Sequence, residues 1–229
     1  MPVRENIEII RTTIAEAALR SGRNPGDVRL MAVTKMVDEE RIREAVACGV
    51  DIIGENYVQE AAQKIDGIGH GVEWHMIGHL QSNKAKYAVR LFNLIHSVDR
   101  VSLAEELDRR SGKAGCTTRI LIEVNASGED TKSGVAVGRA VDLVKAVAVF
   151  RNLSVQGLMA MAAWSQDPEQ ARGTFRAVRE LRDRIIEADI SGVTMKELSM
   201  GMTDEYPVAV EEGATIVRIG RAIFGERKI

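Results

Sequence analysis

The sequence predicts an α/β fold in which residues 1–229 form a single domain, a (β/α)8 TIM barrel with an extra N-terminal helix. Three observations support this prediction. Eight short, β-rich apolar runs alternate with longer runs of helical periodicity. The length of 229 residues suits a barrel of this kind. No stretch rich in Pro, Gly or Ser separates one part of the chain from another.

The elements can be justified in chain order. Ile7, Ile10 and Ile14 recur at helical spacing, and Ser21-Gly22 ends the pattern, so a helix is expected within residues 1–22. The eight strands are expected at residues 29–33, 52–53, 72–77, 94–97, 119–124, 155–158, 194–198 and 215–219. Between them, helices are expected at residues 39–48, 57–65, 83–91, 102–114, 137–150, 169–188 and 204–212, with a short last helix from Arg221. Such alternation calls for parallel strands joined by helical crossovers.

The rival fold is an open, doubly wound sheet. That fold often binds a dinucleotide at a Gly-x-Gly-x-x-Gly sequence after its first strand. Here the first strand is followed by Thr34-Lys35-Met36-Val37, which contains no glycine. The closed barrel is therefore the favoured architecture.

Composition excludes several classes of function. The 31 Lys and Arg residues balance 33 Asp and Glu residues, so neither nucleic acid nor an anionic membrane is an expected partner. The longest apolar stretch, residues 158–164, is too short to span a bilayer, and no signal peptide is recognisable. A cytoplasmic protein is expected. Cys48 and Cys116 are too few for a disulfide scaffold or a zinc cluster, so no metal site is expected.

Polar residues gather at the carboxyl ends of the expected strands, where barrels of this class carry their chemistry. The residues at these strand ends, most of them polar, are Lys35, Glu55, Asn56, His75, Gly78, Ser97, Asn125, Met159, Met161, Ser199, Gly201, Thr203, Arg218 and Gly220. Because the carboxyl ends of the strands meet on one face of a barrel, these residues predict a single site there.

Lys35 directly follows an apolar strand, at the boundary between water and the core. Partial desolvation lowers the pKa of an ammonium group and favours the neutral amine that attacks carbonyls, so Lys35 is a candidate Schiff-base lysine. The alternative is a lysine whose stem is buried while its amine reaches water. Position alone leaves both interpretations open.

A second cluster combines the segments Ser199-Met200-Gly201-Met202-Thr203 and Arg218-Ile219-Gly220-Arg221, which follow or end the last two strands. Glycines allow close approach to a ligand, hydroxyls donate hydrogen bonds, and main-chain amides at the start of helices attract anions. The two segments would be neighbours in a barrel, which predicts a phosphate site. The alternative is that Thr203 caps a helix and Gly220 forms a turn.

Asn56 and the histidines are less specific. Asn56 precedes an expected helix, with Gln59 three residues later, so a capping box explains it better than ligand contact does. His75 and His79 are four residues apart in strand and turn, a spacing that does not indicate a metal site. For His75, His79 and His96, roles in the core, in a loop or beside a ligand stay open.

Five segments together resemble the pyridoxal-phosphate homeostasis protein family, which was once called the proline synthetase co-transcribed family. They are Ala32-Val33-Thr34-Lys35, the segment from Gly54 to Glu60, the segment from Trp74 to Lys84, the segment from Leu198 to Asp204, and the segment from Val217 to Gly225. The chain also resembles the N-terminal barrel of alanine racemase. The likeness covers essentially the whole chain.

This resemblance implies a cofactor and a set of site residues. The cofactor is pyridoxal 5′-phosphate, the active form of vitamin B6, held as a Schiff base on Lys35. Arg218 matches the arginine that faces the pyridine nitrogen. Ser199, Gly201, Thr203, Gly220 and Arg221 match the phosphate-binding residues, while Asn56 and His75 match residues beside the cofactor.

The implied function is intracellular homeostasis of the cofactor, by buffering or delivery, without strong catalysis and with no assigned catalytic residue. Apo forms of pyridoxal-phosphate-dependent enzymes are candidate recipients. A barrel without an arm or second domain is expected to be a monomer. The sequence departs from the family at His79, where many members have proline, and at Met36-Val37-Asp38, which replaces a common Thr-Lys-Pro. The second departure puts cofactor transfer through that position in doubt.

Two other functions are open from the sequence. An arginine at the pyridine nitrogen disfavours ring protonation, which argues against transamination but still permits slow amino-acid racemisation. Racemisation also requires a second acid/base, and Tyr57, Tyr87 and Tyr206 all lie in expected helices. The other rival is a barrel enzyme that acts on a phosphorylated substrate through a transient imine on Lys35.

Overall fold

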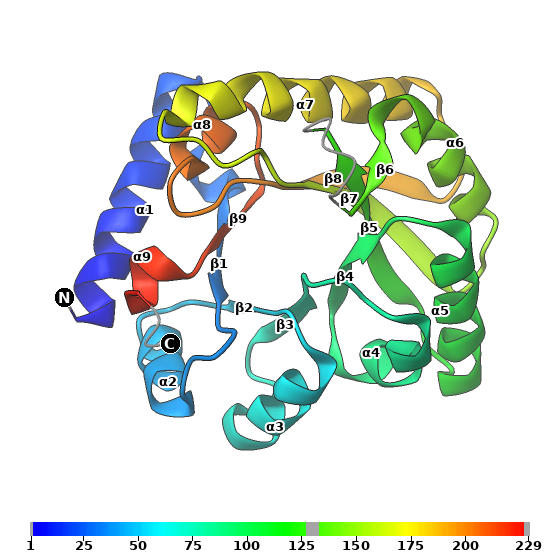
Figure 1. Ribbon diagram of the computed structural model, residues 1–229, viewed down its shortest axis with the longest axis horizontal. Coiled ribbons are helices and arrows are strands. Elements are labelled where there is room, and N and C mark those ends of the chain that lie inside the picture. The colour runs from blue at the N-terminus through cyan, green and yellow to red at the C-terminus, as the bar shows by residue number, and fades with distance from the viewer. Residues whose placement is uncertain (1, 127–132, 227–229) are drawn as a thin grey trace.

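In the computed structural model, which describes residues 2–126 and 133–226, parallel strands form a closed barrel surrounded by helices (Figure 1). Within these residues the strand order is β4-β3-β2-β1-β9-β8-β7-β5-β6, and pairing of β4 with β5 closes the ring. The barrel strands are β1 (Arg29–Val33), β2 (Ile52–Glu55), β3 (Glu73–Met76), β4 (Leu94–Val98), β5 (Thr118–Asn125), β7 (Leu153–Ala160), β8 (Val193–Ser199) and β9 (Ile216–Ile219).

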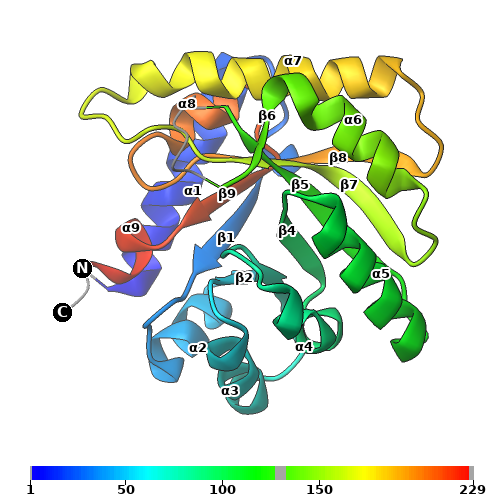
Figure 2. The ribbon, with the colours of Figure 1, turned by 45° about the vertical axis from the view of Figure 1, so that its right-hand side comes forward.

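The helices lie outside the strands, as the turned view in Figure 2 also shows. They are α1 (Val3–Arg20), α2 (Glu39–Ala47), α3 (Val58–Ile68), α4 (Ala85–Leu91), α5 (Val101–Ala114), α6 (Val137–Ala148), α7 (Arg172–Glu187), α8 (Tyr206–Glu211) and α9 (Arg221–Phe224). Short 3-10 helices are found at Pro25–Asp27, Ser82–Lys84 and Pro168–Ala171. Among the residues described, no helix is long and apolar enough to cross a membrane.

The barrel predicted from the sequence is confirmed, and each of the eight expected strands is present. The open-sheet alternative is wrong, because β4 pairs with β5 and leaves no gap in the ring. One strand was not expected: β6 (Val135–Ala136) is only two residues long and pairs with the end of β5. A run this short carries no periodicity that could predict it.

The strands separate two apolar regions. Side chains that point outward pack beneath the helices, as Ile120 and Ile122 of β5 do. Side chains that point inward fill the barrel, and the apolar ones form a separate cluster of Met31, Ile52, Leu94, Leu121, Met159 and Ile216. Because side chains alternate along a strand, Glu123 shares the inward direction of Leu121.

The extra N-terminal helix is also confirmed, and it packs beside the last elements of the chain (Figure 1). Ile7, Ile10 and Ile14 lie on its buried face, and contacts join α1 to α8 and α9. The side chain of Asn6 donates a hydrogen bond to the carbonyl of Ile223 at 2.8 Å. Since β1 pairs directly with β9, the first and last strands of the barrel lie side by side.

Candidate functional site

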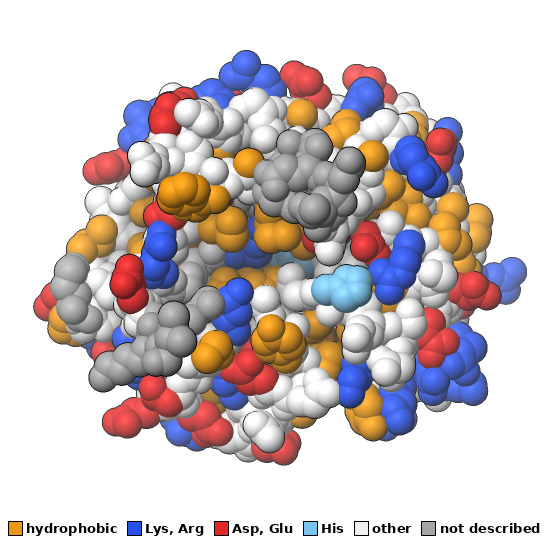
Figure 3. All heavy atoms as spheres, in the orientation of Figure 1, with side chains coloured by type: hydrophobic (Ala, Val, Ile, Leu, Met, Phe, Trp, Pro, Cys, Tyr) orange, Lys and Arg blue, Asp and Glu red, His pale blue; other side chains and the backbone are white. Residues whose placement is uncertain are grey.

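A cavity of about 730 Å³ opens among the carboxyl ends of β1, β7, β8 and β9. Figure 3 shows this face hollowed at its centre, with hydrophobic side chains around the opening and basic side chains within it. Apolar side chains supply much of the wall, namely Val33, Ile77, Met159, Met161, Ala162, Trp164 and Met202. A cavity of this size is ordinary for a small-molecule site.

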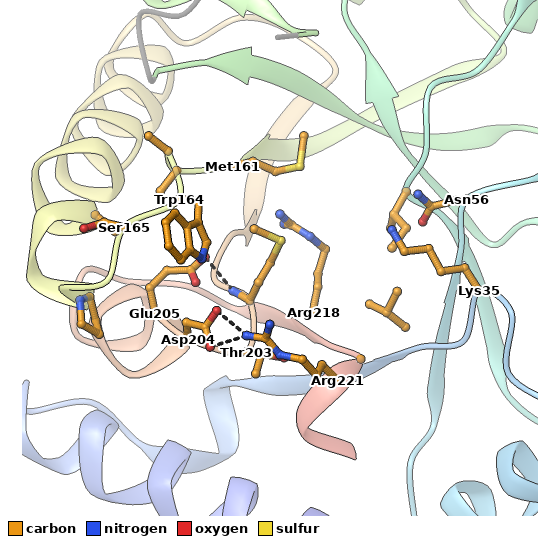
Figure 4. A pocket seen from close by; sticks show the side chains of 18 of the residues that line it. Lys35, Asn56, Met161, Trp164, Ser165, Thr203, Asp204, Glu205, Arg218 and Arg221 are labelled. Atoms are coloured by element: carbon orange, nitrogen blue, oxygen red, sulfur yellow. Dashed lines mark hydrogen bonds and ion pairs between the residues drawn. The ribbon is translucent and has the colours of Figure 1, made fainter. Parts of the chain in front are cut away.

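Six of the residues predicted to form the site line this cavity: Lys35, Asn56, Thr203, Arg218, Gly220 and Arg221. Figure 4 shows Lys35 and Asn56 on one side and Trp164 on the other, with Arg218 between them. Trp164 is 77% exposed, so it stands at the mouth. The cavity therefore presents an amine, a guanidinium and a hydroxyl between apolar walls.

The other three predicted site residues, His75, Ser199 and Gly201, are not part of the lining. The side chains of His75 and Ser199 are fully buried inside the barrel, below the cavity. Gly201 has φ +93°, and a Cβ there would lie 2.6 Å from the Cβ of Ala209, so it allows its loop to approach α8. The carbonyl and hydroxyl groups of Ser199 and the carbonyl of Gly201 hold Arg218 instead.

Arg218 is fixed by groups at the ends of β7 and β8 and in the loop after β8. Its Nη1 donates to the carbonyl of Ser199 at 2.6 Å and to the hydroxyl of Ser199 at 2.9 Å. Its Nη2 donates to the carbonyl of Ala160 at 3.0 Å, and the carbonyl of Gly201 accepts from its main-chain amide. Burial lowers the pKa of Arg218 to about 10, although Glu205 and Glu123 act in the opposite direction. It is therefore still a cation at neutral pH.

The loop that carries Lys35 is anchored by a buried lysine that the sequence analysis did not identify. Lys64 of α3 donates to the carbonyl of Thr34 at 2.5 Å, to Glu55 at 2.8 Å and to Glu60 at 2.7 Å. Glu60 also accepts from the main-chain amide of Met36 at 2.6 Å. This cluster ties the segment on both sides of Lys35 to β2 and α3.

A signal for Lys64 was present in the sequence. It lies at helical spacing with Val58 and Ala61, which are both buried, so it falls on the inward face of α3. A lysine whose amine is buried on such a face needs a carboxylate or other hydrogen-bond acceptors as partners. Glu55 is that partner, and burial raises its pKa even though Lys64 and Thr34 act to lower it.

The loops after β8 and β9 meet as predicted. The hydroxyl of Thr203 accepts a hydrogen bond from the main-chain amide of Ala222 at 3.4 Å, which joins the two loops. Arg221 pairs with Asp204 at 2.5 Å, and Glu205 accepts from the amide of Met202 at 3.1 Å. The interpretation of Thr203 as a helix cap is wrong, because Glu205 occupies the N-cap position of α8.

Asn56 does not have the helix-capping role that the sequence predicts. Helix α3 begins at Val58, its N-cap residue is Tyr57, and no side chain caps it. Asn56 belongs instead to the loop that faces the cavity. The loop after β3 passes so close that a Cβ on Gly78 would lie 2.3 Å from the carbonyl oxygen of Asn56, which explains a glycine at this position.

The departure at Met36-Val37-Asp38 has a local structural role. Asp38 caps α2 by accepting a hydrogen bond from the amide of Arg41 at 3.0 Å. Met36 adopts a φ of +60° and is 70% exposed at the edge of the cavity. His79 lies in the loop after β3, and no group of three or more His, Cys, Asp or Glu among the described residues could hold a metal ion.

Glu123 is a second buried titratable group that sequence reasoning missed. It points into the barrel beside Met159, its register partner on β7, and Met159 lines the cavity. Burial and the nearby Asp99 raise the pKa of Glu123 to about 7, against the pull of Arg218. Glu123 is therefore poised to gain or lose a proton near neutral pH.

A parallel barrel with a lysine after its first strand and a pair of loops that meet after its last two strands defines a class of protein: barrels of the alanine racemase type. A family model described as "Alanine racemase, N-terminal domain" matches residues 4–228. A relative from Aquifex aeolicus named "Pyridoxal phosphate homeostasis protein" is 42% identical over 225 residues, covering 98% of both chains. The chain belongs to the pyridoxal phosphate homeostasis protein family.

Solved structures agree with this assignment. A crystal structure described as that of "an unknown protein from Bifidobacterium adolescentis" is 36% identical and superposes with a TM-score of 0.90, covering 97% of this chain and 94% of its own. PipY from Synechococcus elongatus PCC7942, solved with pyridoxal phosphate bound, is 35% identical with a TM-score of 0.80. That match covers 93% of this chain and 100% of PipY.

Proposed function

We propose that this protein binds pyridoxal 5′-phosphate in the cavity after β1, β8 and β9, and that it serves the homeostasis of this cofactor. The observation that carries the proposal is the presence of Lys35, Arg218 and Thr203 around one cavity. The naming of relatives as pyridoxal phosphate homeostasis proteins and the bound cofactor in PipY support it.

The residues present fit the chemical groups of the cofactor. Lys35 offers an amine for the aldehyde, and the apolar wall offers surfaces for the ring, with Met159 and Met161 among its members. Thr203, Gly220 and Arg221 lie together in the loops proposed to hold the phosphate. When bound, the cofactor supplies an aldehyde that a lysine captures reversibly and a ring that withdraws electrons.

Arg218 is assigned to the pyridine nitrogen and Asn56 to the side of the ring, while His75, Ser199 and Gly201 act from below the cavity. A guanidinium is a hydrogen-bond donor only and carries a positive charge, so it disfavours protonation of the ring. This property weakens the ring as an electron sink and suits storage and delivery better than rapid catalysis.

A slow amino-acid racemase is the second candidate, and Glu123 is the observation that favours it. None of Tyr57, Tyr87 and Tyr206 lines the cavity, whereas Glu123 lies close to it with a pKa of about 7. Exchange of a substrate's α-hydrogen with solvent deuterium separates the two functions. Exchange that depends on Glu123 supports the racemase, and its absence supports a carrier.

We further propose that the protein is a cytoplasmic monomer that delivers the cofactor to apo-enzymes. Cys48 and Cys116 are both free thiols, which suits a reducing compartment. Mixing the loaded protein with an apo-aminotransferase in the presence of a scavenger of free cofactor tests delivery. Light scattering of the same sample tests the oligomeric state.

The experiment that tests cofactor binding compares pyridoxal 5′-phosphate with pyridoxal. If the loops bind the phosphate, loss of one charge-assisted hydrogen bond costs about 1.5 to 3 kcal/mol, or roughly ten- to a hundredfold in affinity. Thr203→Ala is expected to weaken binding of the phosphate ester by about this factor and to leave pyridoxal binding unchanged. If the wild type bound both aldehydes equally well, the phosphate site would lie elsewhere.

The aldehyde end of the site has its own test. Borohydride reduction of the loaded protein followed by peptide mapping is expected to place the cofactor on Lys35. A modified residue other than Lys35 would overturn the assignment, and unmodified protein after reduction would favour the barrel enzyme that acts on a phosphorylated substrate.

A further inference from the structure

A continuous line of hydrogen bonds runs through the barrel from Arg218 to Glu73. The hydroxyl of Ser199 accepts from Arg218 at 2.9 Å and lies 3.0 Å from Nδ1 of His96. Nε2 of His96 lies 3.0 Å from Nδ1 of His75, and Nε2 of His75 lies 3.1 Å from a carboxylate oxygen of Glu73. The three residues between the ends, Ser199, His96 and His75, are fully buried.

The chemistry of its two ends gives this line a single direction. Glu73, as a carboxylate, can only accept, so Nε2 of His75 donates to it and Nδ1 of a neutral His75 accepts from Nε2 of His96. Nδ1 of a neutral His96 then accepts, so the Ser199 hydroxyl turns its hydrogen toward that nitrogen. The Ser199 oxygen in turn accepts from Arg218, which can only donate. This one arrangement satisfies each group with two neutral imidazoles.

Burial supports neutral imidazoles at both positions. Desolvation lowers the pKa of His75, against the opposing effect of Glu73, and the pKa of His96 lies well below its ordinary value because of burial and the nearby His75 and Arg218. The hydrogen bond from His75 holds the pKa of Glu73 at about 2, with Arg29 acting in the same direction.

The line crosses the barrel from one face to the other. Arg218 lines the cavity at the carboxyl ends of the strands, whereas Glu73 is the first residue of β3, at the opposite face. There Glu73 accepts from Arg29, the first residue of β1, at 2.9 Å and from Arg119 of β5 at 3.2 Å. Its side chain is 33% exposed, so this end of the line meets solvent.

We propose that Ser199, His96 and His75 form a one-directional hydrogen-bond chain that positions Arg218 in the cavity and couples it to the charge of Glu73 on the opposite face. The three are positioning residues, because each acts on the ligand through Arg218. The effect on bound pyridoxal phosphate rests on the proposed function, whereas the proton arrangement is a property of the protein alone.

Nitrogen-15 NMR of histidine-labelled protein without cofactor tests the proton arrangement. Both His75 and His96 are expected to be neutral with the proton on Nε2, and His75→Gln and His96→Gln assign the two sets of resonances. A proton on Nδ1 of either ring, or a charged imidazolium, would reverse or break the chain and overturn the proposal. This readout does not depend on whether the protein binds pyridoxal phosphate.

Charge changes at the far face test the coupling. Glu73→Gln replaces a charged acceptor by a weaker neutral one, and it is expected to shift the nitrogen resonances of both histidines and the absorbance maximum of bound pyridoxal phosphate. Arg119→Ala removes a partly exposed cation from Glu73, strengthens it as an acceptor, and is expected to shift the same signals in the opposite direction. A shift of His75 alone would overturn the coupling.

Two controls separate the chain from a general field effect. Glu197→Gln removes an equal charge that also acts on Arg29 but accepts its hydrogen bond from Thr215, so the histidine signals should stay unchanged. Ser199→Ala breaks the link between His96 and Arg218, and in that background Glu73→Gln is expected to lose its effect on the absorbance maximum. An undiminished effect would show that the charge acts through space and would overturn the proposal.

Discussion

Lys35 is carried by a loop that is anchored on both sides of it. It follows β1 by two residues, and the loop is held by the contacts of Lys64 with Thr34 and of Glu60 with Met36. The Lys35 side chain is half-buried and lines the cavity, outside the packed interior of the barrel. Replacing it should therefore change ligand chemistry and leave the fold intact.

Lys35→Ala is expected to abolish covalent capture of pyridoxal phosphate while changing the free energy of unfolding by no more than about 0.5 kcal/mol. Lys35→Arg should fail to restore capture, because a guanidinium stays protonated. Borohydride trapping and urea unfolding measure the two effects, with the exposed Lys86→Ala as a matched control. Covalent capture by Lys35→Arg would contradict the assignment.

Glu123 predicts a pH dependence with a definite sign. Its pKa rises from an ordinary 4.5 to about 7 in the folded protein, so its protonated form stabilises the fold and this stability is lost as pH rises through about 7. Glu123→Gln imitates the protonated form. Between about pH 5 and pH 8 the variant should gain up to about 3 kcal/mol in unfolding free energy relative to the wild type. A pH-independent difference, measured by urea unfolding, would contradict this.

At the residue level, the sequence indicated which strand ends are polar but not where each side chain points. Lys35, Thr203 and Arg218 line the cavity as predicted. His75 and Ser199 are equally polar strand residues, yet both point into the barrel, where each is hydrogen-bonded to His96. Where these side chains point depends on the tilt of the strands and on closure of the whole barrel, which the sequence of a single strand cannot predict.

At the level of the elements, one buried ion cluster holds β1, β2 and α3 together. Lys64 reaches from α3 to the end of β1 and to Glu55 at the end of β2. Glu55 is fully buried, so its carboxylate depends on Lys64 for compensation of its charge.

Lys64→Met is expected to destabilise the protein by about 3 to 5 kcal/mol, because it leaves a buried carboxylate without its cation. The double variant Lys64→Met/Glu55→Gln removes that uncompensated charge and should recover part of the loss. Urea unfolding of both variants measures this. A double variant no more stable than the single one would show that Lys64 acts through packing and not through Glu55.

The elements also show the limit of pattern reading. The eight barrel strands were predictable because each is a β-rich run between helical segments. The expected helix at residues 83–91 divides into a 3-10 turn and α4, and the expected capping box at Asn56 is absent, because end geometry depends on contacts with neighbouring loops. Lys64 was missed because a lysine in a helix is usually read as a surface residue.

For the whole molecule, the buried histidines make stability sensitive to acid. The pKa values of His75 and His96 are lowered in the folded state, so below the ordinary value of about 6.5 the unfolded chain takes up protons that the folded protein does not. Their contribution to stability is present above that pH and is lost as pH falls.

The wild type is therefore expected to lose unfolding free energy between about pH 6.5 and pH 5, by at most about 1.4 kcal/mol per pH unit for each histidine. Protonation of Glu123 in the folded state opposes this loss, so Glu123→Gln should show a steeper acid dependence than the wild type. His96→Gln should flatten the dependence. Urea unfolding across this range checks the slopes, and equal slopes in the three proteins would contradict the histidine explanation.

The pairing of β1 with β9 has a consequence for protein synthesis. Lys35 emerges from the ribosome well before Arg218 and Gly220 do, and the ring cannot close until β9 reaches β1. A partly made chain thus holds a reactive amine without the rest of the site. Ligand that binds only the closed ring favours the completed protein by mass action, so vitamin supply and the yield of mature protein are thermodynamically linked.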